Sequence, residues 1–347
     1  MDNQKYDEIM RKITSGLTGD PDKDLPYLKA QTEMYKDHEL GTEIVRACGR
    51  LIYEVLPEDT KKKLSQHFSN DMTGIDSTLE EVKFNIYKKD PEKALSLIEG
   101  LVEKVEALPM FQDDEVSTYF TFDEAFEEIL YTITRKPQKT VRQATIPYAE
   151  IYFLYGNILF EIGRYEDARA ALEKAMRWNP MSVRIAFEHA ETYKIMGDID
   201  KTEQLTKEIF KIAFKPAMLA RCYRNLGYIY IEKQKLHEAI ICYYLSMQYE
   251  PDSKQAQSEL YYISQQFDVA IDPPTRQEMK DTAKASKFPL GPDEDILGTA
   301  YTLGKQCLDE KKYDLAAYLL QIVYDLTDDQ DVGKMLELIP RTDEKLN

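Results

Sequence analysis

The residues that come closest to a recognisable chemical site are three alternating aspartates near the start of the chain. Asp20, Asp22 and Asp24 have the spacing of the first three ligands in a calcium-binding loop. Such a loop needs glycine at its sixth position and a bidentate glutamate at its twelfth, and these positions hold Leu25 and Gln31. The segment therefore predicts a loop that caps a helix rather than a calcium site.

Other patterns typical of catalysis or metal binding do not occur in the sequence. There is no glycine-rich phosphate loop, no nucleophile elbow and no pair of closely spaced cysteines. No metal-ligand spacing relates the four histidines, which are His38, His67, His189 and His237. We therefore expect no enzyme activity, no cofactor and no metal, and we expect the four cysteines to be reduced, buried thiols.

Composition and charge narrow the classes of partner. The 347 residues include 45 basic and 62 acidic side chains, which gives a net charge of −17. Such a surface repels nucleic-acid backbones and anionic lipids, so neither is an expected partner. The chain begins without an apolar signal segment and has no apolar run near the roughly 18 residues that cross a membrane. These features predict a cytoplasmic, mainly helical protein.

The elements that could position a binding surface are repeated pairs of helices. A stripe of small and aromatic residues, a turn and a second stripe ending at proline recur after 71 residues. The matching positions are Tyr152, Tyr155, Gly156, Leu159, Ala168, Leu172, Ala175 and Pro180 in the first copy, and Tyr223, Leu226, Gly227, Tyr230, Ala239, Tyr243, Ser246 and Pro251 in the second. A weaker copy lies between them, around His189 and Ala190, and a further copy covers about 297–330.

This pattern resembles the tetratricopeptide repeat, a helix–turn–helix unit of 34 residues. Glycine or alanine at positions 156, 190 and 227 lets paired helices approach closely, and Pro180 and Pro251 end the second helices. The resemblance predicts an all-α tetratricopeptide-repeat solenoid with an additional helical N-terminal domain. We assign residues 1–147 to that domain, 148–267 to three repeats, 268–296 to a proline-containing insertion with a short helix near 275–286, and 297–347 to a further repeat and the C-terminal helix and tail.

The resemblance also implies a function, because the first helices of such arrays line a concave groove that binds peptides or partner helices. We therefore expect a non-enzymatic scaffold or adaptor with a protein or peptide partner. The groove residues that it implies are Phe153, Asn157, Phe160, Arg184, Phe187, Glu191, Lys194, Arg221, Arg224, Asn225 and Tyr228. Tyr301 and Lys305 would extend this row if the insertion leaves the last repeat in line.

The arginines of this row suit an acidic peptide, because guanidinium groups pair bidentately with carboxylates. Asn157, Arg221 and Asn225 are similar to the carboxylate clamp of chaperone-binding family members. Phe153 and Glu188 depart from that clamp, which has lysine and asparagine at these positions, so we predict only an acidic or mixed peptide.

Three alternatives remain open at this stage. The arginines could pair within the chain, with Glu188, Glu191 and Glu232. The acidic stretch Asp293–Asp295, or the C-terminal tail, could dock on the arginines as an intramolecular brake. The protein could also be a peptide-sensing regulator that resembles the pheromone receptors of Gram-positive bacteria and acts on a protein target.

Overall fold

The computed structural model describes the backbone of residues 3–108 and 111–340, and the side chains of these residues except 3, 4 and 62–73. Helices make up most of it, which confirms the all-α prediction, and two strands of four residues are added to them. The chain forms two compact units, residues 1–121 with 137–162 (unit 1) and residues 122–136 with 163–347 (unit 2). The domain boundaries drawn from the repeats remain an interpretation of the sequence.

Unit 1 is a set of helices with a short parallel strand pair. Its elements are α1 (Asn3–Ser15), α2 (Pro21–Tyr35), α3 (Gly41–Val55), α4 (Glu58–Tyr87), α5 (Pro91–Glu106), β1 (Ser117–Phe120), β2 (Thr140–Gln143) and α7 (Tyr148–Glu161). Apolar side chains from α1, α2 and α3 form one buried cluster of Ile13, Leu28, Ile44 and Cys48. Helices α5 and α7 pack against each other, and α4 packs on α5.

The aspartates near the start of the chain form the helix-capping loop that their spacing predicts. The Asp20 carboxylate accepts a hydrogen bond from the Asp22 main-chain N–H at the start of α2. The buried Asp24 carboxylate accepts from the main-chain N–H groups of Thr18 and Gly19, both at 2.8 Å. These bonds lower the pKa of Asp24 and fix the loop between α1 and α2.

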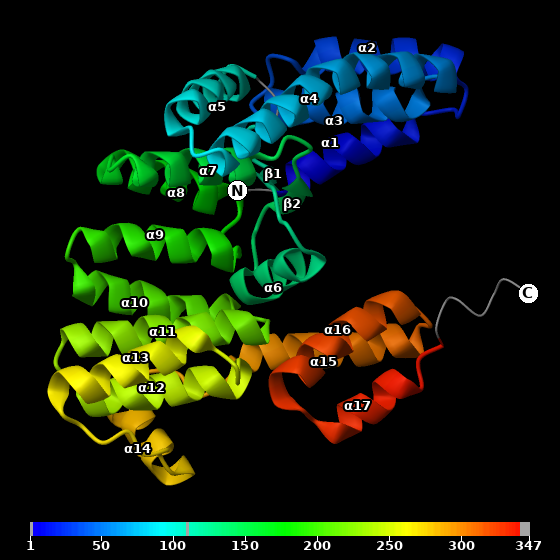
Figure 1. The fold of residues 1–347 in the computed structure, drawn as a ribbon. Helices are drawn as coiled ribbons and strands as arrows, with labels where there is room; N and C mark the ends of the chain where they lie inside the picture. Colours follow the sequence, from blue (N-terminus) through cyan, green and yellow to red (C-terminus); the bar gives the residue numbers. More distant parts are fainter. Residues whose placement is uncertain (1–2, 109–110, 341–347) are drawn as a thin grey trace, which may run out of the picture. The chain divides into compact units, whose positions relative to one another are not determined.

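Unit 2 contains the helical hairpins of the array and a helix from an earlier part of the chain. Its elements are α6 (Ala125–Arg135), α8 (Tyr165–Trp178), α9 (Val183–Ile195), α10 (Ile199–Ile209), the 3-10 turn η1 (Phe210–Ile212), α11 (Pro216–Glu232), α12 (Leu236–Tyr249), α13 (Lys254–Phe267), α14 (Arg276–Ser286), α15 (Glu294–Asp309), α16 (Tyr313–Thr327) and α17 (Gln330–Glu337). Helices α9 to α12 stack in chain order (Figure 1), and α13 packs on α12.

Small residues allow the close helix packing that the repeat pattern predicts. A Cβ atom added to Gly227 on α11 would come within 2.7 Å of the Tyr243 ring on α12. Gly163 and Gly197 have φ of 81° and 82°, a conformation that glycine adopts without strain, and each ends a turn between paired helices. His189 is buried on α9, as its position in the middle repeat predicts.

The insertion folds back on the array instead of extending it. Helix α14 lies where a short helix is expected and packs on α12. The buried Tyr223 hydroxyl donates to the Pro289 carbonyl at 3.1 Å and accepts from the Gly291 N–H at 2.7 Å. Helix α15 then makes its main contacts outside its own hairpin with α6 and η1, so Tyr301 and Lys305 do not extend the row of α9 and α11.

Candidate functional site

The predicted groove residues of unit 2 lie on two neighbouring first helices, α9 and α11. On α9 they recur at intervals of three or four residues and so share one face. On α11 the same spacing relates Arg221, Asn225 and Tyr228, whereas Arg224 directly precedes Asn225. Arg221 of α11 joins the two helices. Its Nη2 atom lies 2.9 Å from Glu188 Oε1 of α9, and its guanidinium covers the Phe187 ring with 4.3 Å between the guanidinium carbon and the ring centroid. Phe187 is thereby buried, whereas Arg221 stays partly exposed.

A second cation joins the same helices in the opposite direction. The Lys194 ammonium of α9 lies 2.7 Å from Glu191 Oε2 and 4.4 Å from the ring centroid of Tyr228 on α11. Burial, together with the nearby carboxylates of Glu232 and Glu191, raises the pKa of the Tyr228 phenol. The face between α9 and α11 therefore carries two clamps, in each of which a cation covers an aromatic ring and pairs with a carboxylate.

Arg224 faces the second helix of its own repeat. Its Nη1 atom bonds to Glu250 and lies 3.2 Å from Ser246 Oγ and 3.5 Å from Ser253 Oγ. Only 12% of the side chain is exposed. Arg224 thus joins α11 to α12 and to Ser253, the residue before α13. Little of its side chain is accessible to a ligand.

Arg184, at the start of α9, lies 3.7 Å from the Asp123 carboxylate, which precedes α6. All three arginines of the predicted row thus have carboxylate partners within unit 2. The alternative of internal pairing holds for Glu188. Glu191 instead pairs with Lys194, and Glu232 lies beside Tyr228. The brake alternative fails for the described residues, because Asp293 caps α15, and the tail 341–347 lies outside them.

Asn225 lies between the two clamps, four residues after Arg221 and three before Tyr228. Its amide is partly exposed and has no hydrogen-bond partner among the residues that the structure describes. The three remaining predicted residues belong to α7 in unit 1. There Phe153 is buried, and Asn157 and Phe160 are partly exposed.

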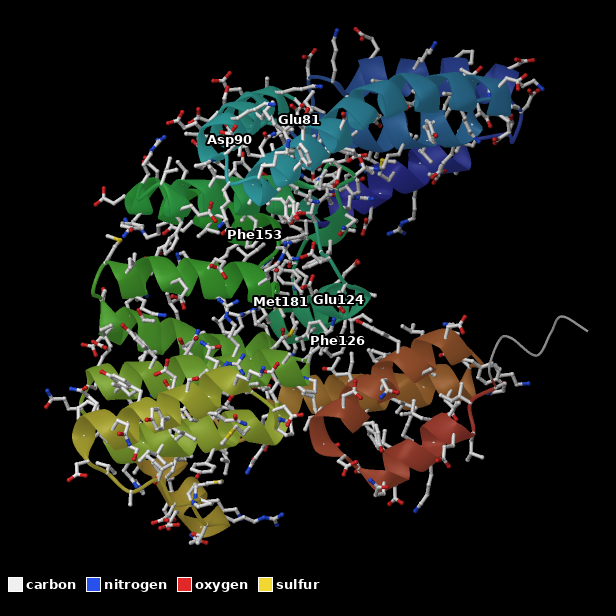
Figure 2. The ribbon with its side chains drawn as sticks, viewed as in Figure 1. Glu81, Asp90, Glu124, Phe126, Phe153 and Met181 are labelled. Carbon is white, nitrogen blue, oxygen red and sulfur yellow. The ribbon has the colours of Figure 1, made fainter. Side chains whose placement is uncertain are left out.

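Helix α6 packs on the turns of the array, which no sequence pattern indicated. The buried Glu127 carboxylate accepts from Asn179 Nδ2 at 2.9 Å and from the Asp123 N–H at 2.7 Å, and burial raises its pKa. Phe126 packs edge-on against Phe214 with 5.1 Å between ring centroids. Figure 2 labels Glu124, Phe126 and Met181 in this region. The neighbours of α6 in space are distant from it in sequence.

Among the described residues, no group of three or more histidine, cysteine or acidic side chains is arranged to hold a metal ion. Within that same part of the chain, no helix is both long and apolar enough to cross a membrane.

Comparison with protein families identifies the helix pairs. Tetratricopeptide repeat models match residues 149–182 and residues 220–253, the two strongest copies of the sequence pattern. The chain thus contains tetratricopeptide repeats in these two segments. Both repeats contribute first helices to the predicted row, and repeats of this kind favour a protein-interaction scaffold over an enzyme.

The similarities of this chain to individual proteins are distant. The human protein O-mannosyl-transferase TMTC1 is 25% identical over 114 residues, which are 33% of this chain and 13% of that protein. The chain therefore spans a small part of that relative. The activity in the relative's name belongs to that protein. The crystal structure of MamA is 17% identical, with a TM-score of 0.34 over 64% of this chain and 96% of MamA. A tetratricopeptide repeat protein from Parabacteroides merdae is 12% identical, with a TM-score of 0.34 over 77% of this chain and 99% of that protein.

Proposed function

We propose that this protein is a non-enzymatic scaffold that holds a peptide or partner helix on the face formed by α9 and α11. The observation that carries the proposal is the position of Asn225. Its amide has both donors and an acceptor, it lies between two rigid clamps, and no described side chain uses it. A polar group in that position suits the main chain of an extended or helical ligand.

The charges of this face indicate a ligand of mixed polarity. Arg221 and Lys194 are neutralised by Glu188 and Glu191, so an acidic ligand would have to displace carboxylates that are already in contact. A ligand with a small net charge can instead stack on the partly exposed edges of Tyr228 and Arg221 without breaking these pairs. We therefore propose a peptide of mixed polarity and small net charge as the ligand, in place of an acidic peptide.

The test is a quantitative capture of partners from a lysate of the source organism. Wild type is compared with Asn225→Ala and with Gln204→Ala, which removes an exposed amide from the second helix α10. Circular dichroism first establishes that all three chains are folded. We expect at least one partner to be retained by wild type and by Gln204→Ala, and to fall about tenfold with Asn225→Ala, which is a loss of about 1.4 kcal/mol.

Equal retention of every partner by all three chains would exclude the α9–α11 face as the site. A partner that binds through this face also allows a second measurement, small-angle scattering with and without the bound peptide. An unchanged scattering profile supports a scaffold. Compaction on binding would favour the alternative of a peptide-sensing regulator.

A further inference from the structure

The two strands of unit 1 form a small sheet with one edge on each strand. Strands β1 and β2 pair in parallel (Figure 1). The Thr140 N–H donates to the Val116 carbonyl at 2.8 Å, and the Ala144 N–H donates to the Phe120 carbonyl at 2.7 Å. Successive residues of a strand direct their main-chain groups to opposite edges, so Thr140 and Ala144 face β1 and Val141 faces away from it.

The outer edge of β1 is covered by the acidic segment that precedes the strand. The Asp113 carboxylate accepts from the Tyr119 N–H at 3.0 Å. Asp114 Oδ1 accepts from the Ser117 N–H at 2.7 Å, and the Ser117 carbonyl accepts from the Asp114 N–H at 3.0 Å. Arg46 lies 3.1 Å from Asp114 Oδ2, and only 2% of the Asp114 side chain is exposed. This acidic segment is therefore fixed on β1.

The outer edge of β2 lacks such a cover. Within the part of the chain that the structure describes, no hydrogen bond involves the main-chain N–H or carbonyl of Val141. Val141 is partly exposed, and Thr140 and Gln143, the end residues of β2, are exposed. An accessible strand edge with an unused donor and acceptor is a template for a further strand.

The residues of β2 and the turn before it carry positive charge without matching carboxylates. Arg142 Nε donates to the Ser117 hydroxyl at 2.9 Å, and the Lys139 ammonium donates to the Asp114 carbonyl at 2.6 Å. Both cations thus contact neutral oxygens, and among the described residues neither has a carboxylate within salt-bridge distance. Residues 129–149 contain four basic and no acidic side chains, although the whole chain has a net charge of −17.

These cations distinguish between the possible occupants of the edge. A second copy of the chain would bring its own Lys139 and Arg142 against the same residues and would be repelled, which is how charged strand edges avoid self-association. An acidic segment is attracted instead. Charges more than about 8 Å away are largely screened at physiological salt, so a short segment interacts mainly with these cations and little with distant acidic residues.

We propose that the open edge of β2 binds an extended acidic segment of a partner protein as a third strand. The N–H and carbonyl of Val141 form main-chain hydrogen bonds to the segment. Side chains alternate between the two faces of a sheet, so the residues beside Arg142 share one face and those beside Val141 share the other. A segment in which acidic and apolar residues alternate matches both faces. The site lies in unit 1 and does not depend on the α9–α11 face.

Fluorescence anisotropy of the full chain with a labelled synthetic peptide tests the edge. The peptide alternates valine and glutamate over about eight residues, the length of an ordinary strand. We expect saturable binding, and a loss of about tenfold or more when the main-chain nitrogens of the peptide are methylated, because methylation removes its donors. A peptide of alternating valine and lysine should not bind. Absence of saturable binding to wild type, or equal binding of the methylated peptide, overturns the proposal.

A proline at position 141 tests the same edge from the side of the protein. Val141→Pro removes the main-chain donor that faces away from β1, and proline is tolerated on a strand edge where its nitrogen faces solvent. The variant should keep the circular dichroism spectrum of wild type and bind the peptide about tenfold more weakly. Val141→Thr keeps the N–H and the branched shape and should bind as wild type does. Equal binding by wild type and Val141→Pro overturns the proposal, and the methylated peptide makes the same test on wild type if the proline variant does not fold.

Two controls locate the bound peptide. Arg142→Gln should weaken binding several-fold, whereas Asn225→Ala should bind as wild type does. Weaker binding by Asn225→Ala alone would place the peptide on the α9–α11 face and overturn the proposal. Sedimentation velocity without peptide should give the same coefficient for wild type and Val141→Pro. A dimer of wild type that Val141→Pro dissociates would assign the edge to a second copy of the chain and also overturn the proposal.

Discussion

At the scale of single residues, most polar side chains of the candidate site bond to other side chains of the same unit. Arg221, Lys194 and Arg224 each contact a carboxylate of unit 2, and Arg224 reaches two hydroxyl groups as well. Burial explains why Arg224 has more bonding partners than Arg221. The ion pair of the half-exposed Arg221 is weakened by solvent, whereas the guanidinium of Arg224 is mostly covered and therefore has to be paired. The few side chains left without partners are thus the informative ones.

Tyr223 is the residue that fastens the insertion to the array. Tyr223→Phe should destabilise the protein by about 1–3 kcal/mol, because it leaves the Pro289 carbonyl and the Gly291 N–H without their partner. Urea unfolding followed by circular dichroism measures the change. The matched control is Tyr249→Phe, since the Tyr249 ring stacks on Tyr223 with 6.1 Å between centroids and its hydroxyl makes none of the described hydrogen bonds. Equal losses in the two variants would show that these bonds are not the cause.

His189 should make stability depend on pH. Burial is the largest influence and lowers its pKa, although Glu173 lies 3.7 Å away and acts in the opposite direction, while Arg169 and Lys201 add to the lowering. The folded protein therefore binds a proton less readily than the unfolded chain, whose histidine titrates near 6.5. Stability from this residue is complete above that pH and is lost as the pH falls through 6.5 towards the lower folded value.

The measurement is the urea midpoint of wild type and His189→Gln between pH 7.5 and 5.5. We expect a steeper decline for wild type, because glutamine does not titrate. The other three histidines are the same in both chains, so the difference isolates His189. If the urea midpoints of the two chains declined in parallel, Glu173 would be stabilising the protonated ring of His189 in the folded protein as well as water does in the unfolded chain.

At the scale of elements, the repeated helices were predictable and the contacts between distant segments were not. A 34-residue period is a local signal, and glycine at position 227 predicted the close approach that Tyr243 makes in the structure. The contact between Glu127 and Asn179 joins residues 52 positions apart, and no local pattern encodes it. The strands β1 and β2 are only four residues long, too short for an alternating pattern to predict.

The candidate site was likewise predictable only where a local sequence pattern determines it. The row of first-helix residues followed from the repeat, because position within a repeat determines which face a residue occupies. The pairing of an arginine with Glu188 was among the alternatives drawn from the sequence. The partners of Arg224 and Arg184 did not follow, since Glu250 lies 26 positions after Arg224 and Asp123 precedes the array altogether.

Helix α6 is expected to be an integral part of unit 2. Phe126 is fully buried beside Phe214, so Phe126→Ala should lower the free energy of unfolding by about 3–5 kcal/mol. Hydrogen exchange should then speed up in η1 and α15, which contact α6 or adjoin that ring. Ile133→Ala on the same helix is the control, because Ile133 is 40% exposed and its truncation should cost under about 1 kcal/mol. Unchanged exchange in both variants would mean that α6 is only loosely attached.

At the scale of the whole molecule, net charge limits which anionic partners can bind. The chain carries a net charge of −17, and both flanks of the clear repeats are acidic, with 20 basic and 29 acidic residues in 1–147 and 10 and 17 in 268–347. A polyanion has to bring many charges against this acidic surface at the same time.

We therefore expect this protein not to bind duplex DNA. Fluorescence anisotropy with a labelled duplex of about 20 base pairs, at about 0.1 M salt, should show no saturable change up to micromolar protein, because an acidic surface does not supply the several phosphate contacts that nucleic-acid affinity requires. A charge-reversed control, in which exposed acidic residues are replaced by lysine, should gain binding that weakens steeply with added salt. Saturable binding of the duplex to wild type would contradict the expectation, since a local surface would then overcome the net charge of the protein.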